Sequence, residues 1–153
     1  MKSLARTLLT AALLAAPLSA APAQPAERTI VDDPAALQRL RRNSGVTLQW
    51  ISFETPARGR VTVSERGGLV RLRGTQVGRN GAGRLELDGE VLRIGASSFT
   101  FRGRIAITDT PDTDRECIRN GDYEFRVTQR RRYWRLQQMT VCDDLTDYVD
   151  IYF

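Results

Sequence analysis

Two groups of acidic residues are the first candidates for chemistry in this sequence. Asp109, Asp112, Asp114 and Glu116 lie close together around Pro111. Carboxylates at this density could bind calcium, but the segment lacks the glycine and the terminal bidentate glutamate of a calcium-binding loop. Aspartates beside a proline are also typical turn residues. We therefore expect turn formation and solvated charge here, and we predict neither a metal site nor another cofactor.

The second acidic group lies near the C-terminus and follows an arginine-rich segment. Its members are Asp143, Asp144, Asp147 and Asp150. Charge balance within one sheet would explain both groups, because opposite charges on adjacent strands attract. If the last strand lies beside the arginine-bearing one, Asp150 can pair with Arg135 in this way.

A carboxylate-dependent hydrolase is an alternative function, since such an enzyme uses two carboxyl groups as acid and base. The candidates for that pair are Asp109, Asp112, Asp143 and Asp144. Spacing in sequence does not determine their separation in space. The chain also has no histidine, so it lacks the commonest general base and the commonest metal ligand. We predict a protein that is not an enzyme and assign no catalytic residue.

Three consecutive arginines, Arg130, Arg131 and Arg132, form a compact cluster of positive charge. Residues 123–128 and 133–137 on either side alternate between apolar and polar, which predicts two strands. The arginines then occupy the turn between them. They are weak candidates for contact with an anionic partner such as an envelope protein, a glycan or a lipid. Nucleic acid is not expected as a partner of an exported protein.

The N-terminal residues have the composition of a secretory signal peptide. Lys2 and Arg6 precede an apolar run from Leu8 to Ala16, and small residues follow. The run is too short for a membrane-spanning helix. We predict a signal peptide over residues 1–23, a linker over 24–31 and a single β-rich domain over 32–153. The protein would then be periplasmic or secreted.

Two further features follow from export. Beyond residue 23 the chain carries 21 basic and 18 acidic residues, a net charge of +3, which does not require a polyanionic partner. Cys117 and Cys142 are the only cysteines and would enter an oxidising compartment, where a disulfide is the expected state. Without histidine to activate either sulfur, we do not expect thiol catalysis.

One short helix and many short strands are predicted. Asp32 or Asp33 can cap a helix that takes Pro34 in its first turn and places Leu37 and Leu40 on one face. After Gly45 the apolar period becomes two. The segments, beginning with 46–53, are divided by the breakers Pro56, Gly59, Gly67-Gly68, Asn80-Gly81, Asp88-Gly89, Pro111 and Asn120-Gly121.

The clearest predicted hairpin is LELDGEVL, in which Asp88-Gly89 forms the turn and Leu85 faces Leu92. About eight or nine consecutive strands indicate an all-β antiparallel meander, closed as a small barrel or folded as a sandwich. The expected core includes Trp50, Phe99, Phe101, Tyr123, Phe125 and Trp134. A barrel of this size either fills its interior or holds one small ligand, so a lipocalin-like carrier is an alternative.

A small outer-membrane barrel is a further alternative, because the chain ends on the aromatic residue Phe153. Arg71 and Arg73 would then face its lumen. Membrane strands need about 9–11 residues, whereas most predicted strands run about five to eight before a glycine or aspartate turn. No stable membrane span is expected.

The chain resembles a family of small exported alphaproteobacterial proteins of uncharacterised activity. The resemblance rests on ITDTPD from Ile107, on Cys117, YWRL, Cys142 and LTDYVDIYF, and earlier on residues 46–53 and GGLVRL. It implies an envelope location and a disulfide between Cys117 and Cys142, but no activity. The sequence therefore predicts a noncatalytic exported β domain that serves as a binding or interaction module of the envelope.

Overall fold

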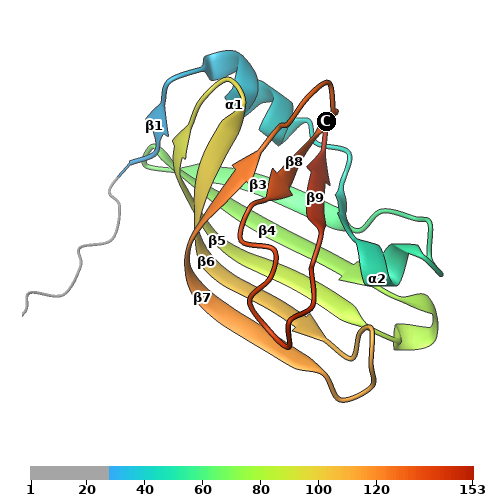
Figure 1. Cartoon of the computed structure of the whole chain (residues 1–153). Helices are drawn as coiled ribbons and strands as arrows, with labels where there is room; N and C mark the ends of the chain where they lie inside the picture. The colour runs from blue at the N-terminus through green and yellow to red at the C-terminus, as the bar shows by residue number, and fades with distance from the viewer. Residues whose placement is uncertain (1–27) are drawn as a thin grey trace, which may run out of the picture.

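The computed structural model describes residues 28–153, so the predicted signal peptide 1–23 and residues 24–27 lie outside the described residues (Figure 1). Within that range the chain forms nine strands, two α-helices and one 3₁₀ turn. The elements are β1 (Ile30–Val31), α1 (Pro34–Arg41), β2 (Val46–Leu48), α2 (Gln49–Ser52), β3 (Arg60–Arg66), β4 (Leu69–Val77), η1 (Arg79–Gly81), β5 (Arg84–Ile94), β6 (Ser98–Thr108), β7 (Glu116–Arg126), β8 (Tyr133–Leu136) and β9 (Val149–Tyr152).

The strands form one barrel-like sheet in the order β2-β9-β8-β7-β6-β5-β4-β3, and each neighbouring pair is antiparallel. The two ends of this order meet where Val46 of β2 and Gly59, just before β3, exchange backbone hydrogen bonds of 2.8 and 3.2 Å. The all-β prediction is confirmed. β1 adds to β5 in parallel, so pairing begins within residues 24–31, the predicted linker.

The predicted N-terminal helix is α1. Asp33 caps it, accepting hydrogen bonds from the N–H groups of Ala35 and Ala36 on Oδ1, and Pro34 occupies the first turn. Leu37 and Leu40 are buried as expected. Figure 1 shows α1 across the end of the barrel where the C-terminus lies.

The segment 46–53, predicted as one strand, is divided between β2 and the single-turn helix α2. The prediction was wrong after Leu48. After Leu48 the chain leaves the sheet, because Val46 pairs with Gly59 and the residues between them must form a loop. Gln49 to Ser52 begin this loop, which forms a corner at the other end of the barrel (Figure 1). Trp50 is consequently only partly buried at that end, packed against the core.

Two glycine turns were also predicted wrongly. Asp88-Gly89 lies inside β5 and Asn120-Gly121 lies inside β7, so LELDGEVL is part of one strand of 11 residues. Leu85 pairs with Gln76 and Ile107 rather than with Leu92, which lies at a bulge in β5. The reason is register: Gly89 pairs with Gly103, and Gly103 pairs with Gly121.

The glycine row lets the sheet curve tightly. The ring of Phe101 lies over Gly89 and Gly103 on the inner face, and a Cβ at Gly89 would stand 2.7 Å from that ring. Glycine inside a strand marks such close approaches and barrel corners. These residues are therefore part of the wall, not of its turns.

Side chains fill the barrel interior. Phe99 stacks on Phe125 with ring centroids 4.9 Å apart, and Trp134 meets Phe99 edge-on at 5.7 Å. Phe101, Phe125 and Trp134 are fully buried, which confirms them as core. The largest described pocket lies outside the barrel, on the outer face of the sheet.

No helix within residues 28–153 is long and apolar enough to cross a membrane.

The strands themselves are longer than predicted, since β5, β6 and β7 have 11 residues each. Arg71 and Arg73 face outward rather than into a lumen, beside Asp88 and Glu90.

Candidate functional site

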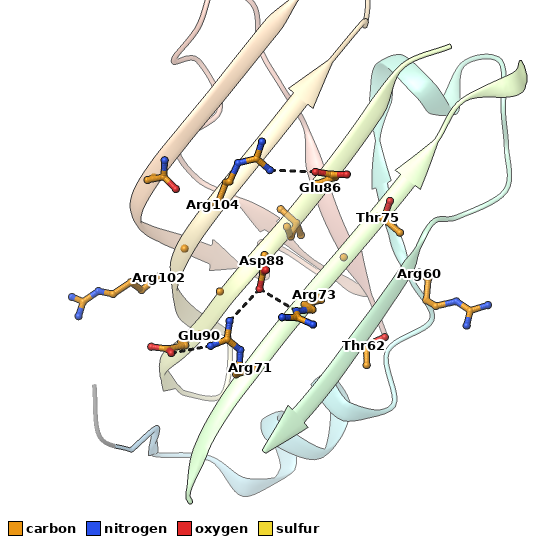
Figure 2. A pocket seen from close by; sticks show the side chains of 15 residues that line it. Arg60, Thr62, Arg71, Arg73, Thr75, Glu86, Asp88, Glu90, Arg102 and Arg104 are labelled. Atoms are coloured by element: carbon orange, nitrogen blue, oxygen red, sulfur yellow. Dashed lines mark hydrogen bonds and ion pairs between the residues drawn. The ribbon is translucent and has the colours of Figure 1, made fainter. Parts of the chain in front are cut away.

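The largest described pocket is a groove of about 740 Å³ across the outer face of β3–β6 (Figure 2). The groove is defined by the following lining residues: Arg60, Thr62, Arg71, Arg73, Gly74, Thr75, Glu86, Leu87, Asp88, Gly89, Glu90, Arg102, Gly103, Arg104 and Asn120. Five arginines and three carboxylates stand on it. Because successive side chains of a strand alternate between faces, the charged residues of this lining point to solvent while their neighbours along each strand, such as Leu72 and Leu87, belong to the core.

Ion pairs organise the middle of the groove. Asp88 Oδ1 accepts from Arg71 Nη2 and from Arg73 Nε, both at 3.2 Å, and Arg71 Nη1 donates to Glu90 Oε1 at 3.3 Å. Arg104 pairs with Glu86 at 3.2 Å. One oxygen of Asp88 thus accepts from two guanidinium groups, and each guanidinium keeps N–H groups that can donate to another anion.

The two flanks of the groove differ. Arg102 forms a bidentate pair with Asp122, at 2.6 and 2.7 Å, and this hydrogen bonding holds the pKa of Asp122 below its usual value. Arg60, on β3, is exposed and has no side-chain hydrogen bond or ion pair among the described residues. In Figure 2 its side chain extends away from the paired centre. Arg60 is therefore an available cation of the groove.

A buried polar network lies at the α2 end of the barrel. The side chains of Arg115 and Asp147 are 5 % and 0 % exposed, and they form a bidentate pair with both distances at 3.1 Å. Asp147 Oδ1 also accepts from Trp50 Nε1 at 2.9 Å. Arg115 further donates to the Thr110 carbonyl and to Asp143. Burial works against the charge of Arg115, but its hydrogen bonds to the two aspartates leave its pKa raised.

Arg119 lies near this network on the inner face of β7. It is 8 % exposed, and its Nη1 donates to the Gln138 carbonyl at 2.7 Å. Its Nε and Nη2 have no partner within residues 28–153. Burial lowers the pKa of this guanidinium. Its described hydrogen bond holds the segment after β8 against β7.

The predicted arginine cluster lies where expected. Arg130, Arg131 and Arg132 occupy the connection between β7 and β8. The Arg131 guanidinium lies 5.6 Å from the ring centre of Tyr133. None of the three lines the groove. Contact with an anionic partner stays a prediction for them.

The acidic residues considered for hydrolysis are spread over two surface pockets and a turn. Asp109 lines a pocket at the α2 end, and Asp112 and Asp143 line a second one beside it. Asp109 Oδ1 accepts from the Asp114 N–H at 3.1 Å, the turn role expected for this segment. Asp144 adopts a positive φ of 54°. Within residues 28–153, no group of three or more His, Cys, Asp or Glu side chains could hold a metal ion.

Two pairings expected from the sequence are present. Arg135 and Asp150 are directly opposed on β8 and β9 and form two hydrogen bonds of 2.7 Å. Cys117 and Cys142 form a disulfide with Cα atoms 5.8 Å apart. It joins β7 to the long β8–β9 connection, which Figure 1 shows running down the barrel wall.

The sequence does not predict the groove. It suggests Arg71 and Arg73 only as lumen residues of a membrane barrel and gives no role to Arg60, Arg102 or Arg104. The available signal was the alternation of charged with apolar residues in GLVRLRG and SFTFRGR. That pattern places the arginines on one face of each strand but does not say which strands are neighbours.

Comparison with known proteins identifies the family. A profile of the PM1083 family matches residues 28–153. The chain belongs to the PM1083 family. The "Uncharacterized protein PM1083" of Pasteurella multocida (strain Pm70) is 39 % identical over 108 residues, covering 69 % of this chain and 68 % of that protein. Pasteurella is a gammaproteobacterium, so the match supports the uncharacterised family but not its restriction to alphaproteobacteria. No solved structure matches the chain significantly.

Proposed function

We propose that the protein is a noncatalytic binding module of the cell envelope that holds an anionic partner in the outer groove. The observation that carries this proposal is the position of the groove: it lies on the outside of a barrel whose interior is packed with aromatic side chains. A lipocalin-like carrier would need that interior space for its ligand. An anionic partner on the outer face needs no interior space, because the arginines of the groove can contact it there.

Electrostatics supports an anionic partner. Five arginines face three carboxylates on the groove, Arg60 is unpaired within the described residues, and Arg71 and Arg73 share Asp88. Arginine presents a planar fork that suits carboxylate and phosphate oxygens. The chemistry fits a carboxylated glycan or protein surface.

The disulfide supports the envelope location. Disulfides such as the one between Cys117 and Cys142 form and persist in oxidising compartments. Mass spectrometry of the protein isolated from its own cells tests the location. We expect a periplasmic protein that lacks residues 1–20 or 1–23. Recovery of the full-length chain from the cytoplasm with both thiols reduced would contradict the location.

Titration with polygalacturonate, a carboxylated glycan, tests the groove. We expect the double variant Arg60→Gln/Arg73→Gln to bind about tenfold or more weakly than the wild type, because two charge-assisted contacts are removed. Binding should also weaken as salt is added. Both residues are exposed, so the fold should be retained.

The matched control is the triple variant Arg130→Gln/Arg131→Gln/Arg132→Gln. It removes more positive charge from the surface but leaves the groove intact. If this control loses binding while the groove variant keeps it, the β7–β8 connection is the contact and the groove proposal fails. If polygalacturonate does not bind the wild type, the anionic-glycan form of the proposal fails.

A further inference from the structure

A second pocket, of about 320 Å³, lies at the α2 end of the barrel, away from the groove. Its walls come from the α2 corner, the β4–β5 turn and the β6–β7 connection. The lining residues are Trp50, Ile51, Phe53, Glu54, Thr55, Gly78, Arg79, Ala82, Asp109, Thr110, Pro111 and Thr113. The groove and this pocket share no residue.

An aromatic pair dominates one wall. Trp50 and Phe53 meet edge-on with ring centroids 6.1 Å apart. Phe53 is 75 % exposed, more than any other large hydrophobic residue among those described as exposed. An exposed aromatic side chain beside a pocket is a mark of ligand binding, because its apolar surface gains by being covered.

The Trp50 indole is held in place from behind. Its Nε1–H donates to Asp147, which is fully buried and fixed by the Arg115 fork. Thr110, which lines the pocket from the β6–β7 connection, is fixed by the hydrogen bond that its carbonyl accepts from Arg115. One buried ion pair therefore positions two walls of the pocket, which is the arrangement that pre-organises a binding site.

The remaining lining offers hydrogen-bonding groups without strong positive charge. Among the described residues, the Glu54 carboxylate accepts no hydrogen bond and forms no ion pair, and only one oxygen of the Asp109 carboxylate accepts a hydrogen bond. The lining contains two carboxylates, Glu54 and Asp109, and one cation, Arg79, so its net charge is −1. The pocket thus combines an aromatic wall with hydrogen-bond acceptors and hydroxyl groups, and its charge disfavours an anion.

We infer that this pocket binds a pyranose ring of an uncharged glycan. The apolar C–H face of the sugar packs on Trp50 and Phe53, and its hydroxyl groups donate to Glu54 and Asp109. A pocket of about 320 Å³ lies at the lower end of the range for small-ligand sites, which suits one or two sugar units rather than a long chain.

Titration calorimetry with a probe panel of N-acetylglucosamine trisaccharide, cellotriose and maltotriose tests the inference. We expect at least one trisaccharide to bind. Phe53→Ala should weaken that binding about tenfold, because it removes the aromatic contact. Glu54→Gln should weaken it to a lesser degree, since the amide retains one acceptor oxygen. Both side chains are solvent-exposed, so the variants should fold as the wild type does.

Val141→Ala is the control for loss of an exposed apolar side chain, since Val141 is 55 % exposed and lies outside the pocket. It should bind like the wild type, and so should the groove variant Arg60→Gln/Arg73→Gln. The inference is overturned if none of the three trisaccharides binds, or if Phe53→Ala and Glu54→Gln both bind as tightly as the wild type. Neither result bears on polygalacturonate binding, so the proposal for the groove and the inference for this pocket are tested separately.

Discussion

Among single residues, Asp147 and Arg115 have the largest expected effect on stability. Both side chains are buried and each is the principal partner of the other. Removing Asp147 leaves the buried Arg115 with only the exposed Asp143 as a counter-charge. Breaking a buried pair in this way costs about 3–5 kcal/mol, whereas exposed pairs contribute about 0–1 kcal/mol. The surface pairs of the groove belong to the second group, since their side chains are about half exposed.

We therefore predict that Asp147→Ala lowers the free energy of unfolding by about 3–5 kcal/mol. Denaturant unfolding of the purified protein measures this. The double variant Arg115→Met/Asp147→Leu should be more stable than Asp147→Ala, because no charge is left buried. A double variant as unstable as Asp147→Ala would show that the loss comes from altered packing and not from the unpaired guanidinium.

The Arg102–Asp122 pair gives a pH dependence of known sign. Hydrogen bonding to Arg102 lowers the pKa of Asp122 from its ordinary 3.8 in the folded state. The stabilisation is therefore present above the unfolded pKa and is lost as pH falls through the folded pKa. Asp122→Asn should be slightly less stable than the wild type at neutral pH, and the difference should vanish in strong acid. Unfolding curves across this range test the sign, and a difference that grows with acidity would contradict it.

At the scale of elements, the glycine row joins β5, β6 and β7 into one curved wall. Gly89 and Gly103 have no space for a Cβ because the Phe101 ring and the opposing backbone occupy it. At Gly121 the nearest atom to a Cβ would be the Tyr123 hydroxyl oxygen, at 3.5 Å, an ordinary contact. The row is thus tightly constrained at two positions and open at the third.

Alanine substitutions should separate these positions. Gly103→Ala is expected to destabilise the protein by about 1–3 kcal/mol or more through overpacking. The matched variant Gly121→Ala should change stability by less than about 0.5 kcal/mol, since its methyl group meets no close neighbour. Thermal or denaturant unfolding compares the two. Equal destabilisation would mean that glycine is needed at both positions for backbone conformation and not for space.

For the whole molecule, the Cys117–Cys142 disulfide decides how firmly the β8–β9 connection stays on the barrel. It spans 25 residues in sequence and lies beside the Arg115–Asp143 contact. Closing a loop of this length should stabilise the fold by about 3.5 kcal/mol by restricting the unfolded chain. The double variant Cys117→Ser/Cys142→Ser should lose about this amount in denaturant unfolding. An unchanged midpoint would show that the ion pairs alone hold the connection.

The whole molecule also presents two separate surfaces for binding. The groove is formed by strands from the middle of the sheet and is lined by arginine, whereas the α2 pocket is formed by corners and turns and is lined by aromatic and acidic residues. If both proposals hold, a carboxylated ligand and an uncharged glycan should bind together without competition.

The sequence by itself determined local features well. The capping of α1 by Asp33, the alternation that buries Phe125 and Trp134, the Gly67-Gly68 turn and the all-β class all follow from residues near one another in the chain. The Arg135–Asp150 pair was also predictable, because the two strands are consecutive and their alternating patterns place both residues on the outer face.

Only the tertiary structure decided the features that depend on register. Asp88-Gly89 lies in a curved strand and not in a turn, because Gly89 pairs with Gly103 on the next strand. Local residue preferences do not predict that pairing. The groove and the α2 pocket arise in the same way, since each collects residues from segments far apart in the chain. Sequence periodicity assigns a side chain to a face, but only the pairing of strands and the closure of the barrel decide which faces and corners become neighbours.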